Sequence, residues 1–327
     1  MKKIIAIVLL TAFIAGAAFA QVAGYGRIRL NFGADIPLSE NPDVKWVFVP
    51  TARLGLRGGN DTVSFFAQAD LNTRNVLGTW RANATVKFSE MALSIGQNEL
   101  PWIQWSSLAL YGDQNSGFGI SQSTVDPYLR FDFFGAYVGI NSGNLMVNGA
   151  IVKDFPIPGI FAGYDYKAET FSVGLAFAGL VNKKDEDVFS WMGNVHAKIN
   201  AAPAVIGLNF AFYGAPQFGF FNLNGGEGIQ NGKDALVIEA MIDTSFKFTP
   251  CTLAFTGAII SNVAEKEKNG GGNALKFGLC SSFDIGGGFR FIPGVMLTHF
   301  ISGPGGVKYK DAEKTTMQAG TTFLYQF

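Results

Sequence analysis

The amino-acid sequence predicts an all-β protein: a transmembrane antiparallel β-barrel of about sixteen strands. Three observations lead to this prediction. Charged residues make up only 15% of the chain, against ~25% in ordinary soluble domains. Apolar residues recur at every second position, and after residue 20 no apolar run is long enough for a membrane-spanning helix. Only helices and closed barrels satisfy every backbone group in lipid, so alternation without long apolar runs favours the barrel.

The first twenty residues, 1–20, have the pattern of a secretory signal peptide. Two lysines precede an apolar run at residues 4–14, and the small-x-small stretch Ala-Phe-Ala ends the segment. This pattern predicts cleavage before Gln21 and export from the cytoplasm. The alternative is an uncleaved anchoring helix, but the run is shorter than the ~20 residues of a membrane span. We therefore expect residues 21–327 to form a single barrel domain.

Along the mature chain, polar and apolar residues fall on opposite faces of each predicted strand. In the first strand Arg27 and Arg29 alternate with Ile28 and Leu30, which is the two-residue period of a strand. In a membrane barrel the apolar face meets lipid and the polar face lines water. The predicted strands are residues 22–33, 46–57, 62–72, 78–88, 90–97, 128–140, 144–153, 159–168, 170–181, 188–199, 203–214, 235–248, 251–262, 274–285, 289–302 and 314–327.

Short and long connections alternate between these strands, which is typical of outer-membrane barrels. An even number of strands also brings the last strand beside the first. The C-terminal TTFLYQF then pairs with VAGYGRIRLNF, so neither strand is left as an unpaired edge. The predicted short turns are residues 58–61, 141–143, 201–202, 249–250 and 286–288, and the long loops are 34–45, 98–127, 215–234, 263–273 and 303–313.

On these features the mature chain resembles the general, trimeric porins of Gram-negative outer membranes. The resemblance rests on sixteen strands, a first strand directly after the signal peptide, a C-terminal Phe and an unusually long third loop. It implies short periplasmic turns, long extracellular loops and a homotrimer in the outer-membrane lipid of a diderm bacterium. In that family the barrel-assembly machinery reads the terminal aromatic strand, a role that the resemblance gives to Phe323, Tyr325 and Phe327.

The third loop, residues 98–127, is too apolar for a disordered exposed loop because it carries Trp102, Trp105 and Leu108. In porins the corresponding loop folds back into the lumen and narrows the pore, and we expect the same here. The alternatives are a loop packed on top of the barrel or against a neighbouring subunit. The Pro-Glu-Phe-Gly-Gly-type motif of familiar porin loops is absent from this sequence, and Gly117-Phe118-Gly119 is only a faint echo of it.

Basic residues dominate the predicted inner face, and they are Arg27, Arg29, Arg53, Arg57, Arg81, Lys87 and Arg130. The third loop offers three acidic residues, Glu99, Asp113 and Asp126. This distribution resembles the porin arrangement of a basic wall facing acidic loop residues, and charges on opposite walls select which ions pass. The excess of basic groups predicts a mild anion preference. Four further acids should also face the lumen and oppose that preference: Asp70, Asp132, Glu239 and Asp243.

The sequence therefore predicts a porin, a passive diffusion channel for small hydrophilic solutes and ions. The alternatives are a substrate-specific channel, or a surface-exposed adhesin or structural barrel with a closed lumen. No enzyme, cofactor or metal site is expected, because His196 and His299 lie in no metal-ligand motif. A net charge of zero gives no case for nucleic-acid binding. Cys251 and Cys280 are predicted to be out of register for a disulfide.

Overall fold

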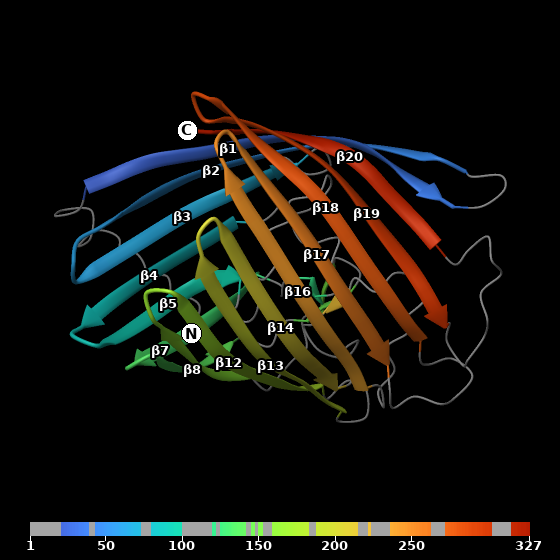
Figure 1. Cartoon of the computed structure of the whole chain (residues 1–327). Helices are drawn as coiled ribbons and strands as arrows, with labels where there is room; N and C mark the ends of the chain where they lie inside the picture. The colour runs from blue at the N-terminus through green and yellow to red at the C-terminus, as the bar shows by residue number, and fades with distance from the viewer. Residues whose placement is uncertain are drawn as a thin grey trace.

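The computed structural model shows a closed barrel of sixteen antiparallel strands (Figure 1), which confirms the predicted fold class. Within the described residues no helix is long and apolar enough to cross a membrane. The structure describes residues 21–38, 43–72, 80–99, 120–121, 125–141, 145–147, 150–152, 159–182, 188–214, 222–223, 236–262, 272–302 and 315–327.

Each barrel strand pairs with the strands before and after it, and the last pairs with the first. The barrel strands are, in order, β1 (Gln21–Pro37), β2 (Lys45–Gly59), β3 (Val63–Asn72), β4 (Trp80–Phe88), β5 (Met91–Glu99), β7 (Val125–Phe133), β8 (Ala136–Asn141), β11 (Gly159–Lys167), β12 (Phe171–Asn182), β13 (Val188–Ala201), β14 (Ala204–Gly214), β16 (Leu236–Phe248), β17 (Cys251–Asn262), β18 (Gly272–Gly286), β19 (Phe289–Ser302) and β20 (Thr315–Gln326). Two small two-stranded sheets are not part of this ring: β9 (Leu145–Val147) with β10 (Ala150–Val152), and β6 (Ile120–Ser121) with β15 (Asn222–Leu223).

Apolar side chains on the outer face are exposed, and the polar residues that alternate with them point inward. Ile28 and Leu30 are 43% and 41% exposed, whereas Arg29 between them is 5% exposed. A soluble sheet would expose the opposite face, so the pattern fits a barrel whose outer surface faces lipid. Aromatic residues gather on the outer face near the short turns, with ring pairs at Tyr166–Phe171, Phe246–Phe248, Phe283–Phe291 and Phe289–Tyr325.

The predicted strand count is correct, but two of the sixteen strands were wrong. Residues 128–140, predicted as one strand, are the two strands β7 and β8, joined by a tight turn at Phe134 and Gly135, which have φ of 48° and 85°. Residues 144–153, predicted as a barrel strand, contain the β9–β10 hairpin, which pairs with no barrel strand among the described residues. The predicted turn at 141–143 is therefore the start of a long connection from β8 to β11. A change of phase marks the true turn, because Phe131 and Phe133 face outward while Val138 and Ile140 take over that face after it.

The barrel closes where the C-terminal strand meets the first. β20 pairs with β1 from Arg27–Gln326 to Pro37–Thr316, as predicted. The backbone of Phe327 continues the ladder: the N–H of Gly26 donates to its carbonyl at 2.9 Å, and its own N–H donates to the carbonyl of Gly26 at 3.1 Å. The Phe327 ring lies over Gly26, where any side chain would collide with it. The glycine thus makes room for the terminal aromatic.

One strand pair joins distant parts of the barrel. β6 belongs to the chain between β5 and β7, whereas β15 belongs to the chain between β14 and β16. Ser121 pairs with Asn222, and Ile120 pairs with Leu223. The pair therefore links segments that start from widely separated strands of the ring.

Candidate functional site

The inner face of β1 to β8 carries a group of charged residues, here called the charged wall. Its basic members are the seven predicted ones, and its acidic members are Asp70 and Asp132. All nine alternate with outward-facing apolar residues on their strands, as the sequence predicted. The members are Arg27, Arg29, Arg53, Arg57, Asp70, Arg81, Lys87, Arg130 and Asp132.

Asp70 on β3 is the centre of the charged wall because it binds two arginines. Arg53 on β2 is its direct cross-strand partner and donates through Nε at 2.7 Å and Nη2 at 3.0 Å. Arg81 on β4 donates through Nη1 to Oδ2, the oxygen that also accepts from the Arg53 Nη2. Gln68 also donates to Asp70 at 3.3 Å and accepts a hydrogen bond from the Tyr25 hydroxyl at 3.0 Å. The bidentate, charge-assisted contact fixes the guanidinium plane of Arg53, and a single charge-assisted bond holds Arg81 to the same carboxylate.

Other cations of the charged wall have separate surroundings. The Arg57 guanidinium lies 5.7 Å from the centre of the Tyr25 ring, near the short turns. Lys87 is exposed near the end of β4. Arg130 binds Asp132 through Nε at 2.9 Å and lies 4.2 Å from the centre of the Tyr137 ring.

Arg27 and Arg29 border the closing seam. Arg27 is partly exposed and lies opposite Arg53, while Arg29 is almost fully buried and lies opposite Leu324 of β20. Next to them the Thr322 hydroxyl donates to Asn31 at 2.7 Å, which ties the seam together on its inner side.

The predicted acidic loop residues fall into two groups. Glu99 and Asp126 were assigned to the loop, but the backbone places them in β5 and β7, where Glu99 pairs with Val125 and Asp126 pairs with Asn98. The ladder between these strands continues beyond the point where the alternation in sequence ends, so the connection is residues 100–124. Asp113 lies outside the described residues. Among described side chains, Asp70 and Asp132 on the wall itself provide the acidic partners of the arginines.

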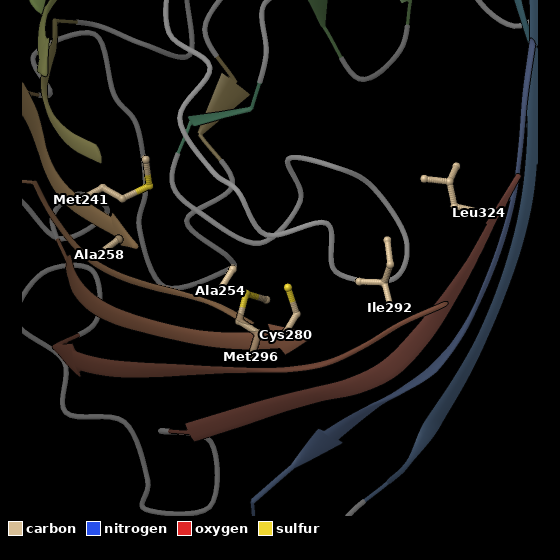
Figure 2. Close-up of a cluster of buried hydrophobic side chains, with 7 residues drawn as sticks. All are labelled: Met241, Ala254, Ala258, Cys280, Ile292, Met296 and Leu324. Atoms are coloured by element: carbon tan, nitrogen blue, oxygen red, sulfur yellow. The ribbon is translucent and has the colours of Figure 1, made fainter. Parts of the chain in front are cut away.

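The inner face of β16 to β20 is different, and we call it the apolar wall. Its side chains form one cluster, shown in Figure 2, and each is less than one-tenth exposed. The cluster places two methionines and a cysteine on the inner side of the barrel. The members are Met241, Ala254, Ala258, Cys280, Ile292, Met296 and Leu324. Cys251 pairs in register with Phe283, whereas Cys280 pairs with Ala254, which confirms that the cysteines are out of register.

Three charged residues lie within or beside the apolar wall. Asp243 accepts a hydrogen bond from Thr256 at 2.6 Å. Glu239 on β16 and Lys276 on β18 are 1% and 3% exposed and interact electrostatically across β17. The inward orientation predicted for both Glu239 and Asp243 is thus observed, but these residues are buried rather than solvated.

The structure also reveals a polar group that the sequence did not predict as a site. Asp165 on β11 and His196 on β13 approach each other across Gly174 of β12, with 3.3 Å between Oδ1 and Nε2. Alternation places all three positions on the inner face, but only the registers of two strand pairs bring them into one row. The sequence feature that could have predicted this row is a glycine on the inner face of one strand, flanked on both neighbouring strands by ionisable inward residues.

The chain was compared with known proteins at the level of sequence and of structure. No protein-family model and no curated protein sequence matches it. Solved porin structures match most of the chain. The anion-selective porin of Comamonas acidovorans is 13% identical, with a TM-score of 0.64 over 94% of this chain and 100% of that one.

Two further structures show the same fold. The Salmonella typhi OmpF, solved with daunomycin, is 15% identical, with a TM-score of 0.65 over 94% of this chain and 97% of that one. The trimer form of OmpT, an outer-membrane protein of Vibrio cholerae, is 12% identical, with a TM-score of 0.57 over 94% and 99%. At this level of identity the likeness concerns the fold: the chain has the sixteen-stranded barrel fold of the Gram-negative porins.

Proposed function

We propose that this protein is an outer-membrane porin, a channel through which small hydrophilic solutes and ions diffuse down their gradients. The observation that carries the proposal is the pairing of a closed barrel with an exposed apolar outer face and a charged inner wall. No chemical step is required, since the charged groups only replace part of the water around a passing solute.

The charge of the inner wall favours anions in this proposal. On β1 to β4 six cations face the lumen, namely Arg27, Arg29, Arg53, Arg57, Arg81 and Lys87, and Asp70 neutralises one of them. Field lines concentrate in a narrow aqueous lumen with low-dielectric walls, so an excess of fixed positive charge raises the local concentration of anions.

The proposed constriction lies between the charged wall and the loop predicted at residues 98–127. The β6–β15 pairing supports an inward course for this loop, because it joins the connection after β5 to the connection before β16. Location and assembly are part of the same proposal: export through the signal peptide at residues 1–20, insertion by the barrel-assembly machinery through Phe323, Tyr325 and Phe327, and a homotrimer in the outer membrane.

The direct test is to refold the purified protein into a planar bilayer, record single-channel conductance and measure the reversal potential across a KCl gradient. We expect stepwise currents and a reversal potential displaced towards that of Cl⁻. The double variant Arg27→Gln/Arg57→Gln removes two accessible cations of the charged wall and should shift the reversal potential towards K⁺. Lys247→Gln is the matched control, because it removes a cation near the short turns on β16, away from the charged wall. Cation preference in the unmodified protein would refute the proposed anion selectivity but would still support the proposal that the protein is a channel.

A second candidate function is a surface-exposed adhesin or structural barrel with a closed lumen. The burial of the apolar wall favours it, since these inward side chains do not line open water. Absence of current from a protein shown to be folded would support this candidate over the channel.

A further inference from the structure

The row formed by Asp165, Gly174 and His196 has the geometry of a metal-binding pair. The three residues are successive cross-strand partners on β11, β12 and β13. Gly174 has no side chain, and a Cβ built there would lie 2.5 Å from the His196 Nε2. The carboxylate and the imidazole therefore meet across a strand, over a space that only glycine leaves open.

The hydrogen bonds of Asn194 determine which nitrogen of His196 carries a proton. The carbonyl of Phe210 can only accept, so the Asn194 atom 3.2 Å from it is the donor Nδ2. The Asn194 Oδ1 then faces the His196 Nδ1 at 3.0 Å and must accept a hydrogen bond from it. Because Nδ1 is the donor, a neutral His196 directs the lone pair of Nε2 at the Asp165 carboxylate.

Two acceptors that face each other at 3.3 Å need a positive charge between them. One solution is a second proton on His196, which makes an ion pair. The other is a metal ion bound by both atoms. Zinc binds His nitrogen at about 2.0–2.1 Å and carboxylate oxygen at about 2.0–2.2 Å in a tetrahedral arrangement, which places two such ligands about 3.3–3.4 Å apart. The observed separation equals this value.

The surroundings match those of a ligating histidine. Metal-bound His usually donates its other N–H to a carbonyl or carboxylate, which fixes the ring; Asn194 has this role here and is itself bound to Asn209. Asp165 and His196 are 38% and 14% exposed, so the lumen can supply the ion. Lys167 and Lys198 lie on the same face in the next row, and Arg130 acts electrostatically on Asp165. These cations oppose weak, purely electrostatic binding of Mg²⁺ or Ca²⁺, whereas an imidazole ligand favours zinc and later first-row metals.

We propose that Asp165 and His196 form a lumen site for Zn²⁺ or a similar transition-metal cation. The described residues contain no group of three or more metal-ligating side chains, so water or solute completes the coordination. The site is independent of whether the barrel conducts ions, because it needs only the β11–β12–β13 registers.

The test is a zinc titration of the refolded barrel in detergent at pH 7.5, with bound metal measured by equilibrium dialysis. Cys251→Ser/Cys280→Ser serves as the starting protein so that thiols do not bind zinc. We expect one site lost in His196→Gln and in Asp165→Asn, each with at least a ten-fold weaker apparent affinity. His299→Gln is the matched control, since this histidine binds Thr315 on the outer side of the barrel and should leave zinc binding unchanged.

Gly174→Ala provides a second measurement that keeps both ligands. Its methyl group occupies the space between them and should weaken zinc binding to a similar extent, with folding verified by the heat-dependent mobility of the barrel on gels. Zinc binding that is equal in the starting protein, His196→Gln and Gly174→Ala would overturn the proposal. Absence of any bound zinc would identify the pair as an ion pair with an imidazolium only.

Discussion

The charged wall and the apolar wall are built from the same kind of strand, but their inward side chains are held by different interactions. On β2 to β4 the charged inward side chains around Asp70 are partly exposed and are ordered by ion pairs, with Asp70 holding Arg53 and Arg81. On β16 to β20 they are buried and held by packing, with Met296 and Ile292 at 4% and 6% exposure. The inner face of one barrel therefore combines an ion-paired group around Asp70 with a buried hydrophobic cluster.

The difference shows that a side chain can point into this barrel without being exposed to water. The two walls meet at the closing seam, where Arg29 lies opposite Leu324. Inward positions at Arg53 on β2 and Asp70 on β3 are charged and about one-quarter exposed, whereas inward positions on β16 to β20 join a hydrophobic cluster.

The largest expected effect comes from placing a charge on the apolar wall. Met296→Lys buries an ammonium group among apolar side chains and should lower the free energy of unfolding by about 3–5 kcal/mol, measured by urea titration in detergent. Ser64→Lys places the same charge on the charged wall, at a partly exposed position, and should lower the free energy of unfolding by less than about 0.5 kcal/mol. Equal losses would show that the two walls are packed alike.

The next effect tests the seam that joins the walls. Phe327→Ala removes the ring over Gly26 and its contact with Tyr325 at 5.5 Å, and should cost about 1–2 kcal/mol. Phe171→Ala removes an exposed ring that contacts Tyr166 at 5.9 Å on β12, away from the seam. A loss for Phe171→Ala as large as that for Phe327→Ala would argue against a special contribution of the seam.

A smaller effect is expected at the centre of the charged wall. Asp70→Asn removes one negative charge, worth ~0.8 kcal/mol for an ion at ~10 Å with an effective dielectric constant of about 40. The change favours Cl⁻ about four-fold and disfavours K⁺ about four-fold, so the ratio of Cl⁻ to K⁺ permeability should rise roughly sixteen-fold, as read from reversal potentials. Asp61→Asn, in an exposed turn, should change the ratio little. A fall in the ratio for Asp70→Asn would mean that Arg53 and Arg81 move away from the ion path when released.

The smallest effect is expected at the edge of the charged wall. Arg57→Gln breaks an exposed contact with the Tyr25 ring at 5.7 Å, which is worth ~0.5 kcal/mol. Urea titration should show a change of this size and an unaltered barrel. A loss above about 2 kcal/mol would indicate that Arg57 is part of the rigid network around Asp70.

Much of the fold could be predicted from the sequence, because the alternation of polar and apolar residues within a single strand shows which side chains share a face. Alternation placed Arg29, Asp70 and Glu239 inside correctly, and it predicted the closing pair of strands. It was wrong between residues 128 and 153. The apolar residues on both sides of the Phe134–Gly135 turn were assigned to one strand, and the β9–β10 segment was assigned to a barrel strand because its residues also alternate. One missed barrel strand and one extra barrel strand cancelled, so the predicted number of barrel strands remained sixteen.

The candidate sites were less predictable, because each depends on register between strands. The sequence supplied the basic residues of the charged wall but assigned their acidic partners to the loop, whereas Asp70 and Asp132 on the wall bind Arg53, Arg81 and Arg130. It assigned no role to His196, because that residue lies in no metal-ligand motif.

The sequence by itself determined that this chain forms a closed barrel of alternating strands and which side chains face inward, since a two-residue period is a local property of the backbone. Only the tertiary structure decided which inward residues meet. Pairing across strands sets Arg53 against Asp70 and Asp165 against His196 over Gly174. Register is a relation between segments, and the curvature of the whole wall decides whether an inward side chain meets water or other side chains.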